Sequence, residues 1–94
     1  MVEYLYDAIR AASGQDIPVV AKITDEEGII IAGGCTLTLS DGDSAIIKVS
    51  GAFDGEQWIF TIPADVTEGK RGRYWYCISH NDVDLCFYQP IYLI

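Results

Sequence analysis

Cysteine and histidine are the side chains of this sequence with the widest chemical repertoire. Cys77 and Cys86 flank His80, and a thiol beside an imidazole is the usual pair for nucleophilic thiol catalysis. Such a pair needs a cleft and a third group that orients the base, whereas His80 precedes an expected turn at Asn81 and Asp82. We therefore expect no catalytic site here, and the protein is predicted not to be an enzyme.

The same three residues together with Cys35 match the ligand count of a tetrahedral zinc site. Structural zinc sites usually take their ligands in close pairs of the Cys-x-x-Cys type, and no such pair occurs in the sequence. An odd number of cysteines also argues against a secreted disulfide framework. We expect three reduced thiols that act as small apolar side chains, with no metal and no cofactor.

Two acidic segments centred on glycine resemble the start of a calcium loop. Asp41-Gly42-Asp43 and Asp54-Gly55-Glu56 each place carboxylates around a glycine, but neither continues into the twelve-residue ligand pattern of an EF-hand. An Asp-Gly pair is also a strong signal for a β-hairpin with a type I′ turn. We interpret both segments as hairpin turns, with weak calcium binding as the alternative.

The charge balance limits the classes of partner. Fourteen acidic and six basic residues give a net charge of -8, which disfavours nucleic acid and anionic membranes, although Lys70, Arg71 and Arg73 form a small basic patch. The longest apolar run, residues 29–35, is far shorter than the ~20 residues that span a bilayer. The first residues lack the features of a secretory signal, so we expect a protein that stays in a cytoplasm or is assembled there into a larger particle.

Period-two alternation dominates the chain from Ile17 onward and predicts an all-β domain. Half of the 94 residues are hydrophobic, which is enough for one domain over residues 1–94. Residues 1–13 are expected to form an N-terminal strand or arm. The alternation of Val2, Tyr4 and Tyr6 favours a strand there over a helix. We expect about seven strands in an antiparallel β-sandwich. The predicted core consists of Leu37, Leu39, Ile47, Val49, Trp58, Phe60, Ile78 and Leu85, with Thr36 and Thr38 facing solvent.

The last hairpin has two apolar faces, although a two-layer sandwich buries only one face of each sheet. A turn centred on residues 81–82 places Cys77 opposite Cys86 and Trp75 opposite Tyr88. Tyr76, Ile78, Leu85 and Phe87 are then expected in the core, and the opposite face is expected to contact a partner, because Trp and Tyr are enriched at protein interfaces. The predicted partner-binding residues are Trp75, Cys77, Cys86, Tyr88 and Tyr92.

Sugar binding is the alternative for the aromatic side chains, because rings stack on the apolar faces of sugars. The candidates are Trp58, Phe60, Tyr74, Trp75, Tyr76, Phe87, Tyr88 and Tyr92. Most of them are expected in the core, where large rings bury the most apolar surface. A carbohydrate- or cell-surface-binding β-sandwich is therefore the second hypothesis.

Two levels of resemblance sharpen these expectations. Gly72-Arg73-Tyr74, followed by Trp75-Tyr76-Cys77, resembles the tyrosine corner of immunoglobulin-like domains. Together with Gly14-Gln15-Asp16-Ile17-Pro18 and Trp58-Ile59-Phe60-Thr61-Ile62-Pro63, the sequence is similar to immunoglobulin-like structural proteins of tailed phages and prophages of Gram-positive bacteria, and resembles the N-terminal domain of baseplate upper proteins. The resemblance implies an immunoglobulin-like sandwich and a virion component that contacts copies of itself or tail and baseplate proteins, without catalytic residues.

Overall fold

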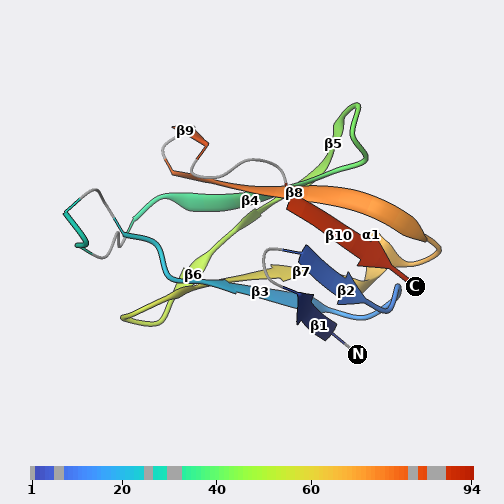
Figure 1. Cartoon of the computed structure of the whole chain (residues 1–94), viewed down its shortest axis with the longest axis horizontal. Coiled ribbons are helices and arrows are strands. Elements are labelled where there is room, and N and C mark those ends of the chain that lie inside the picture. The colour runs from blue at the N-terminus through green and yellow to red at the C-terminus, as the bar shows by residue number, and fades with distance from the viewer. Residues whose placement is uncertain (1, 6–7, 25–26, 30–32, 81–82, 85–88) are drawn as a thin grey trace.

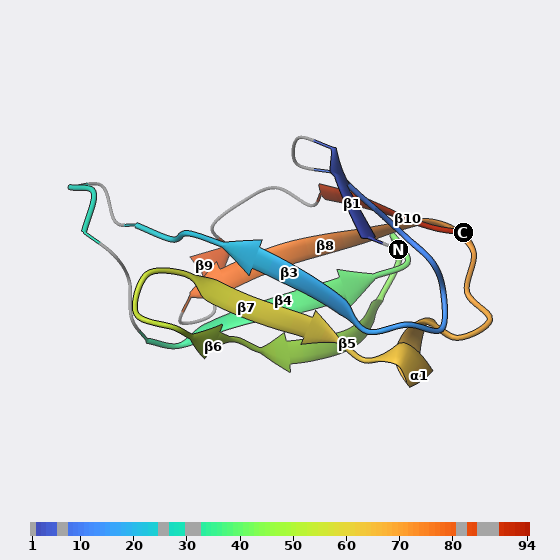
Figure 2. The ribbon, with the colours of Figure 1, turned by 90° about the horizontal axis from the view of Figure 1, so that it is seen from below.

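The computed structural model describes residues 2–5, 8–24, 27–29, 33–80, 83–84 and 89–94, of which residues 2–5, 8, 83 and 84 are described by their backbone alone. Two β-sheets lie one above the other, with β4, β8 and β10 in the upper layer of Figure 1 and β3, β6 and β7 in the lower layer. Figure 2, seen from below, shows β3 and β7 crossing in front of β4 and β8. The all-β sandwich predicted from alternation is therefore confirmed.

The larger sheet has the order β1-β2-β10-β8-β4-β5, and β9 pairs with the end of β8. Its strands are β1 (Val2–Leu5), β2 (Ala8–Ala11), β4 (Cys35–Ser40), β5 (Ala45–Ser50), β8 (Gly72–His80), β9 (Val83–Asp84) and β10 (Gln89–Leu93). The smaller sheet has the order β3-β7-β6, with strands β3 (Ile17–Ala21), β6 (Ala52–Phe53) and β7 (Trp58–Ile62). A short helix, α1 (Ala64–Thr67), links β7 to β8.

This strand order is that of an immunoglobulin-like sandwich. In such domains strands A, B, E and D form one sheet and strands C, F and G the other, and variable-type domains add strand C′ beside C. The sheet β3-β7-β6 has the order B-E-D, and the sheet segment β10-β8-β4-β5 has the order G-F-C-C′. β2 comes before the B strand in the chain but pairs with β10 of the other sheet, and β1 and β9 are additional short strands.

One pair of strands departs from the purely antiparallel expectation. β2 runs parallel to β10, with Ile9 opposite Ile91 and Ala11 opposite Leu93. All four of these side chains are buried, so the parallel pair lets an early segment of the chain complete the core beside the last strand. The strand expected near the N-terminus is confirmed, but it is folded into two short strands, β1 and β2.

The core lies between the two sheets, and alternation selects its members. Trp58, Phe60 and Ile62 of β7 face Leu37 and Leu39 of β4, and all five are at most 5% exposed. Among the other predicted core residues, Ile78 is buried, Ile47 and Val49 of the edge strand β5 are half-buried, and Leu85 lies outside the described residues. Edge strands have a neighbour on one side only, which explains the partial burial in β5.

The expectation that Thr38 faces solvent is wrong. Thr38 points away from the core, yet it is buried at 7% exposure, and Thr36 is half-buried. β4 is a central strand, so Thr38 is flanked by Lys48 of β5 and Cys77 of β8. A short side chain with a neighbouring strand on both sides loses most of its contact with water, whichever face it occupies.

The register of the last hairpin is confirmed only near its turn. His80 lies opposite Val83 and Ser79 opposite Asp84, as predicted. Tyr76, however, lies opposite Gln89, so three positions along β8 correspond to five positions of the chain between β9 and β10. The predicted pairing of Trp75 with Tyr88 is wrong, because Trp75 lies opposite Pro90, and the predicted pairing of Cys77 with Cys86 involves a residue outside the described ones.

A hydrogen-bonded corner joins the start of β3 to α1. Thr67 is fully buried, and its Oγ1 accepts a hydrogen bond from the amide of Gly14 at 3.1 Å. The Asp16 carboxylate accepts a hydrogen bond from the amide of Ala64 at 2.8 Å. Tyr74 of the proposed tyrosine corner is half-buried against the core. These contacts hold α1 against the start of β3, and α1 precedes β8, which carries the candidate site.

Candidate functional site

Alternation along β8 divides its side chains between two surfaces. Tyr76 and Ile78 belong to the core cluster, whereas Trp75 and Cys77 point to the opposite, outer face of the larger sheet. The predicted division of the last hairpin is thus confirmed for these four residues. Its other members, residues 85–88, lie outside the described residues, so the predicted site residues Cys86 and Tyr88 are not placed.

Trp75 and Tyr92 are brought together on this outer face by a residue that the sequence analysis did not assign to the site. Arg73 lies opposite Tyr92, and Trp75 lies two positions further along β8. The guanidinium carbon of Arg73 is 5.6 Å from the centre of the Trp75 ring and 5.7 Å from that of Tyr92. Both distances fall within the range of cation–π attraction. The spacing of Arg73 and Trp75, alternate residues in a strand, was the signal that could have found this group.

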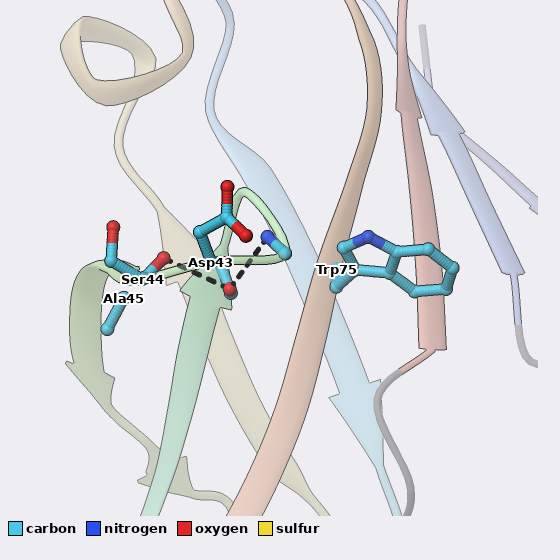
Figure 3. Close-up of a pocket in the computed structure, with 6 residues that line it drawn as sticks. Asp43, Ser44, Ala45 and Trp75 are labelled. Carbon is cyan, nitrogen blue, oxygen red and sulfur yellow. Dashed lines mark hydrogen bonds between the residues drawn. The ribbon is translucent and has the colours of Figure 1, made fainter.

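A hollow adjoins Trp75 on the side of the loop between β4 and β5. Its volume is about 530 Å³, and Figure 3 shows Trp75 facing the loop across it. The lining residues are Ser40, Gly42, Asp43, Ser44, Ala45 and Trp75. A Cβ at Gly42 would lie 3.5 Å from Nε1 of Trp75, so a methyl group at this position would make an ordinary contact with the indole edge. Two segments far apart in the sequence therefore form one surface.

The loop between β4 and β5 is held in shape by its own side chains. The Asp41 carboxylate accepts hydrogen bonds from the amides of Asp43 and Ser44 at 2.8 and 2.9 Å. The Ser40 hydroxyl donates to the carbonyl of Ser44 and accepts from the amide of Gly42, both at 3.0 Å (Figure 3). The predicted hairpin is confirmed, although its loop spans residues 41–44 and is longer than a two-residue turn.

The loop between β6 and β7 repeats this chemistry. Its Asp54 carboxylate accepts hydrogen bonds from the amides of Glu56 and Gln57, both at 2.9 Å. In both loops these amides lower the pKa of the aspartate, because they stabilise the charged form. Within the described part of the chain, no group of three or more His, Cys, Asp or Glu side chains is arranged to hold a metal ion.

Cys77 does not form the pair with His80 that the sequence suggested, and Cys86 lies outside the described residues. Cys77 and His80 are an odd number of positions apart on β8, so their side chains leave opposite faces of the sheet. The residue opposite His80 is Cys35, a buried core thiol whose pKa is raised by burial. Cys35 and Cys77 are both in the thiol form and lie on opposite faces of the sheet.

The expected aromatic platform is reduced to a few rings. Trp58, Phe60 and Tyr76 are buried in the core, and Tyr74 packs against it. Phe87 and Tyr88 lie outside the described residues. Among the described rings, Trp75 and Tyr92 are half-buried on the outer face, so the candidate site consists of these two rings, Arg73 and the adjoining hollow. The predicted site residue Cys77 lies on the same face but is buried at 1% exposure, so it offers little surface to a partner.

Comparisons with known proteins add no further restriction. No protein-family model, curated protein or solved structure matches the chain. Within the described residues, no helix is long and apolar enough to cross a membrane.

Proposed function

We propose that the protein is a non-enzymatic protein-binding module that joins a larger assembly through the outer face of its larger sheet. The observation that carries this proposal is the group of Trp75, Arg73 and Tyr92 outside the core. Its rings are half-buried and retain surface for a partner, and interfaces concentrate Trp, Tyr and Arg in this way. The assembly in this proposal is a virion of a tailed phage or prophage, in which the module contacts copies of itself or tail and baseplate proteins.

Support for the virion assignment comes from the sequence resemblance described above. Immunoglobulin-like sandwiches serve many functions, so the fold alone does not select this one. The proposal accordingly places the protein in the virion, or in the host cytoplasm before assembly.

The test replaces Trp75 with alanine. We expect the variant to stay folded, with a loss of unfolding free energy of about 1–2 kcal/mol from the lost cation–π contact and packing. Association should weaken by about 2 kcal/mol or more, as for a central interface residue. Sedimentation velocity measures self-association, and pull-down with phage tail and baseplate proteins measures the alternative partner.

Val20→Ala is the matched control, because Val20 is 46% exposed on the outer face of the other sheet. It should leave association unchanged. Equal association of the Trp75→Ala variant and the wild type in both assays would refute the proposal. Unfolding of the Trp75→Ala monomer would show that the ring serves the core.

A carbohydrate-binding role is supported by one specific observation, the hollow beside Trp75. Its wall combines an indole with the oxygen atoms of Ser40, Asp43 and Ser44, and sugar sites combine ring stacking with polar contacts of this kind. A glycan array separates the two functions. A sugar whose binding is lost in both Trp75→Ala and Asp43→Ala would favour this second function.

A further inference from the structure

We propose that the outer face of the larger sheet binds an acidic segment of a partner protein, with Arg73 pairing with one of its carboxylates. This inference rests on the proposed function and names the chemistry of the partner. It is carried by the placement of basic residues on the sheet, by the geometry of Arg73 and by the charge of the whole chain.

Basic residues gather on this part of an otherwise acidic protein. The parallel pairing of β2 with β10 places Arg10 opposite Tyr92, and the antiparallel pairing of β8 with β10 places Arg73 opposite the same residue. Cross-strand partners share a face, so two arginines flank one tyrosine across three strands, and both are exposed. Lys70 and Arg71 directly precede β8. Lys48 of β5 lies on the same face, because it is opposite Thr38, so five of the six basic residues of the chain lie on or next to this face. The acidic Glu3 of β1 lies opposite Arg10, which leaves Arg73 as the arginine on which the inference rests.

The guanidinium group of Arg73 is positioned by its neighbours to bind a carboxylate. The rings of Trp75 and Tyr92 lie within 5.6 and 5.7 Å of its guanidinium carbon. Contacts to the rings restrict the rotamers of a long side chain, which reduces the entropy lost on binding. No described residue forms an ion pair with Arg73, and its side chain is exposed, so a partner can reach its N–H groups. The planar guanidinium can donate two parallel hydrogen bonds to one carboxylate, which lysine cannot do.

The charge of the chain selects a short acidic segment over a nucleic acid. A polynucleotide extends beyond the patch and meets the field of a protein whose net charge is -8, which is unfavourable. A peptide segment can confine its carboxylate to Arg73. Asp43 borders the hollow on the other side of Trp75, so the part of the peptide that enters the hollow is expected to be uncharged.

The test uses an array of synthetic twelve-residue peptides that combine Glu and Leu in all registers, with a matched array in which Gln replaces Glu. Fluorescently labelled wild-type protein should bind members of the Glu array and not their Gln counterparts. Anisotropy titration of the best Glu peptide should show at least tenfold weaker binding for both Arg73→Gln and Arg73→Lys. Asp43→Asn should bind more tightly, because a like charge is removed. Binding should weaken as salt is raised.

Lys22→Gln is the charge-matched control, because it also removes one positive charge. Lys22 directly follows β3 of the smaller sheet, away from the proposed surface, so its replacement should change the affinity little. Equal binding of Glu and Gln peptides, or equal affinity of wild type and Arg73→Gln, would overturn the inference. Tighter binding of a twelve-residue oligothymidylate than of any Glu peptide would also overturn it. If Trp75→Ala abolishes assembly while Arg73→Gln does not, the proposed function survives and the acidic partner is wrong. If neither variant affects assembly, both proposals fail.

Discussion

The two tryptophans of this protein occupy environments that assign them different tasks. Trp58 is 5% exposed and lies between Phe53 and Phe60, with ring centroids 5.3 and 6.2 Å away. Trp75 is half-buried, and its described ring contact is with the cation of Arg73. In the core, tryptophan stabilises the fold by packing against other rings. On the outer face of the larger sheet, it contacts a cation and leaves part of its surface accessible. The neighbours of an aromatic residue therefore say more about its role than its type does.

Each tryptophan also lies against a glycine, and the fit differs. A Cβ at Gly51 would lie 2.5 Å from Cε3 of Trp58 and 2.7 Å from Cε1 of Phe60, so the core has no room for a methyl group. A Cβ at Gly42 would lie 3.5 Å from Nε1 of Trp75, an ordinary contact. The core tryptophan is fitted closely to its glycine, whereas the surface tryptophan leaves space beside the loop.

Removing the core ring should have the largest effect. Trp58→Ala should lower the free energy of unfolding by about 3–5 kcal/mol, because it removes a large buried side chain and leaves a cavity. Urea denaturation followed by circular dichroism measures the change, with Trp75→Ala as the comparison. A smaller loss for Trp58→Ala than for Trp75→Ala would reverse the assignment of the two rings.

Filling the glycine beside the core ring should have the next largest effect. Gly51→Ala should cost about 1–3 kcal/mol, because the new methyl group forces neighbouring side chains to move. The cost should shrink in a Trp58→Leu background, where the clash with the ring is relieved. Gly42 has a φ of 104°, so Gly42→Ala should be destabilising through the backbone, and a Trp75→Leu background should not reduce its cost. Equal coupling in the two double-mutant cycles would contradict this contrast.

Replacing the two loop aspartates, Asp41 and Asp54, should have the smallest effect, and it should appear in how the stability of the protein depends on pH. Asp41 and Asp54 have pKa values below the ordinary 3.8, because backbone amides stabilise their charged forms. Their folded-state pKa values lie below those of the unfolded chain, so their stabilising contribution is present above about pH 4 and is lost as the pH falls further. The double variant Asp41→Asn, Asp54→Asn should therefore lose less stability than wild type between about pH 5 and about pH 3. Thermal unfolding at both pH values measures this, and identical losses would contradict it.

Local patterns predicted the fold well, because they act through neighbouring residues. Alternation placed Trp58 and Phe60 in the core, and Asp-Gly pairs marked both hairpin loops. The register of the last hairpin was predictable near its turn but not at Trp75, because the pairing of Tyr76 with Gln89 is offset by two residues from that of Ser79 with Asp84. An offset of two leaves the alternation unchanged, so the alternation gave no sign of it. The parallel partner of β10 was not predictable, since no local signal connects Ile9 with Ile91.

The candidate site was predicted only in part, because local patterns determine some of its features and long-range pairing determines the others. Alternation placed Trp75 outside the core, and an apolar pattern on both faces indicated a second contact surface. The position of Arg73 between two rings depends on which residue of β10 lies opposite β8. The hollow depends on a loop from another strand pair. Both are products of tertiary register, which a period-two pattern leaves open.

The parallel pairing of β2 with β10 also determines how the domain resists mechanical force. Ile9 lies opposite Ile91 and Ala11 opposite Leu93, and further backbone hydrogen bonds join Ile94 to Ala11 and Ser13. A force that pulls Ala8 and Leu93 apart acts along both strands in opposite directions, so the interstrand hydrogen bonds bear the load together and do not open one after another. A domain built in this way is expected to hold under tension until the whole pair slides, which single-molecule pulling through these two positions would detect as one abrupt rupture.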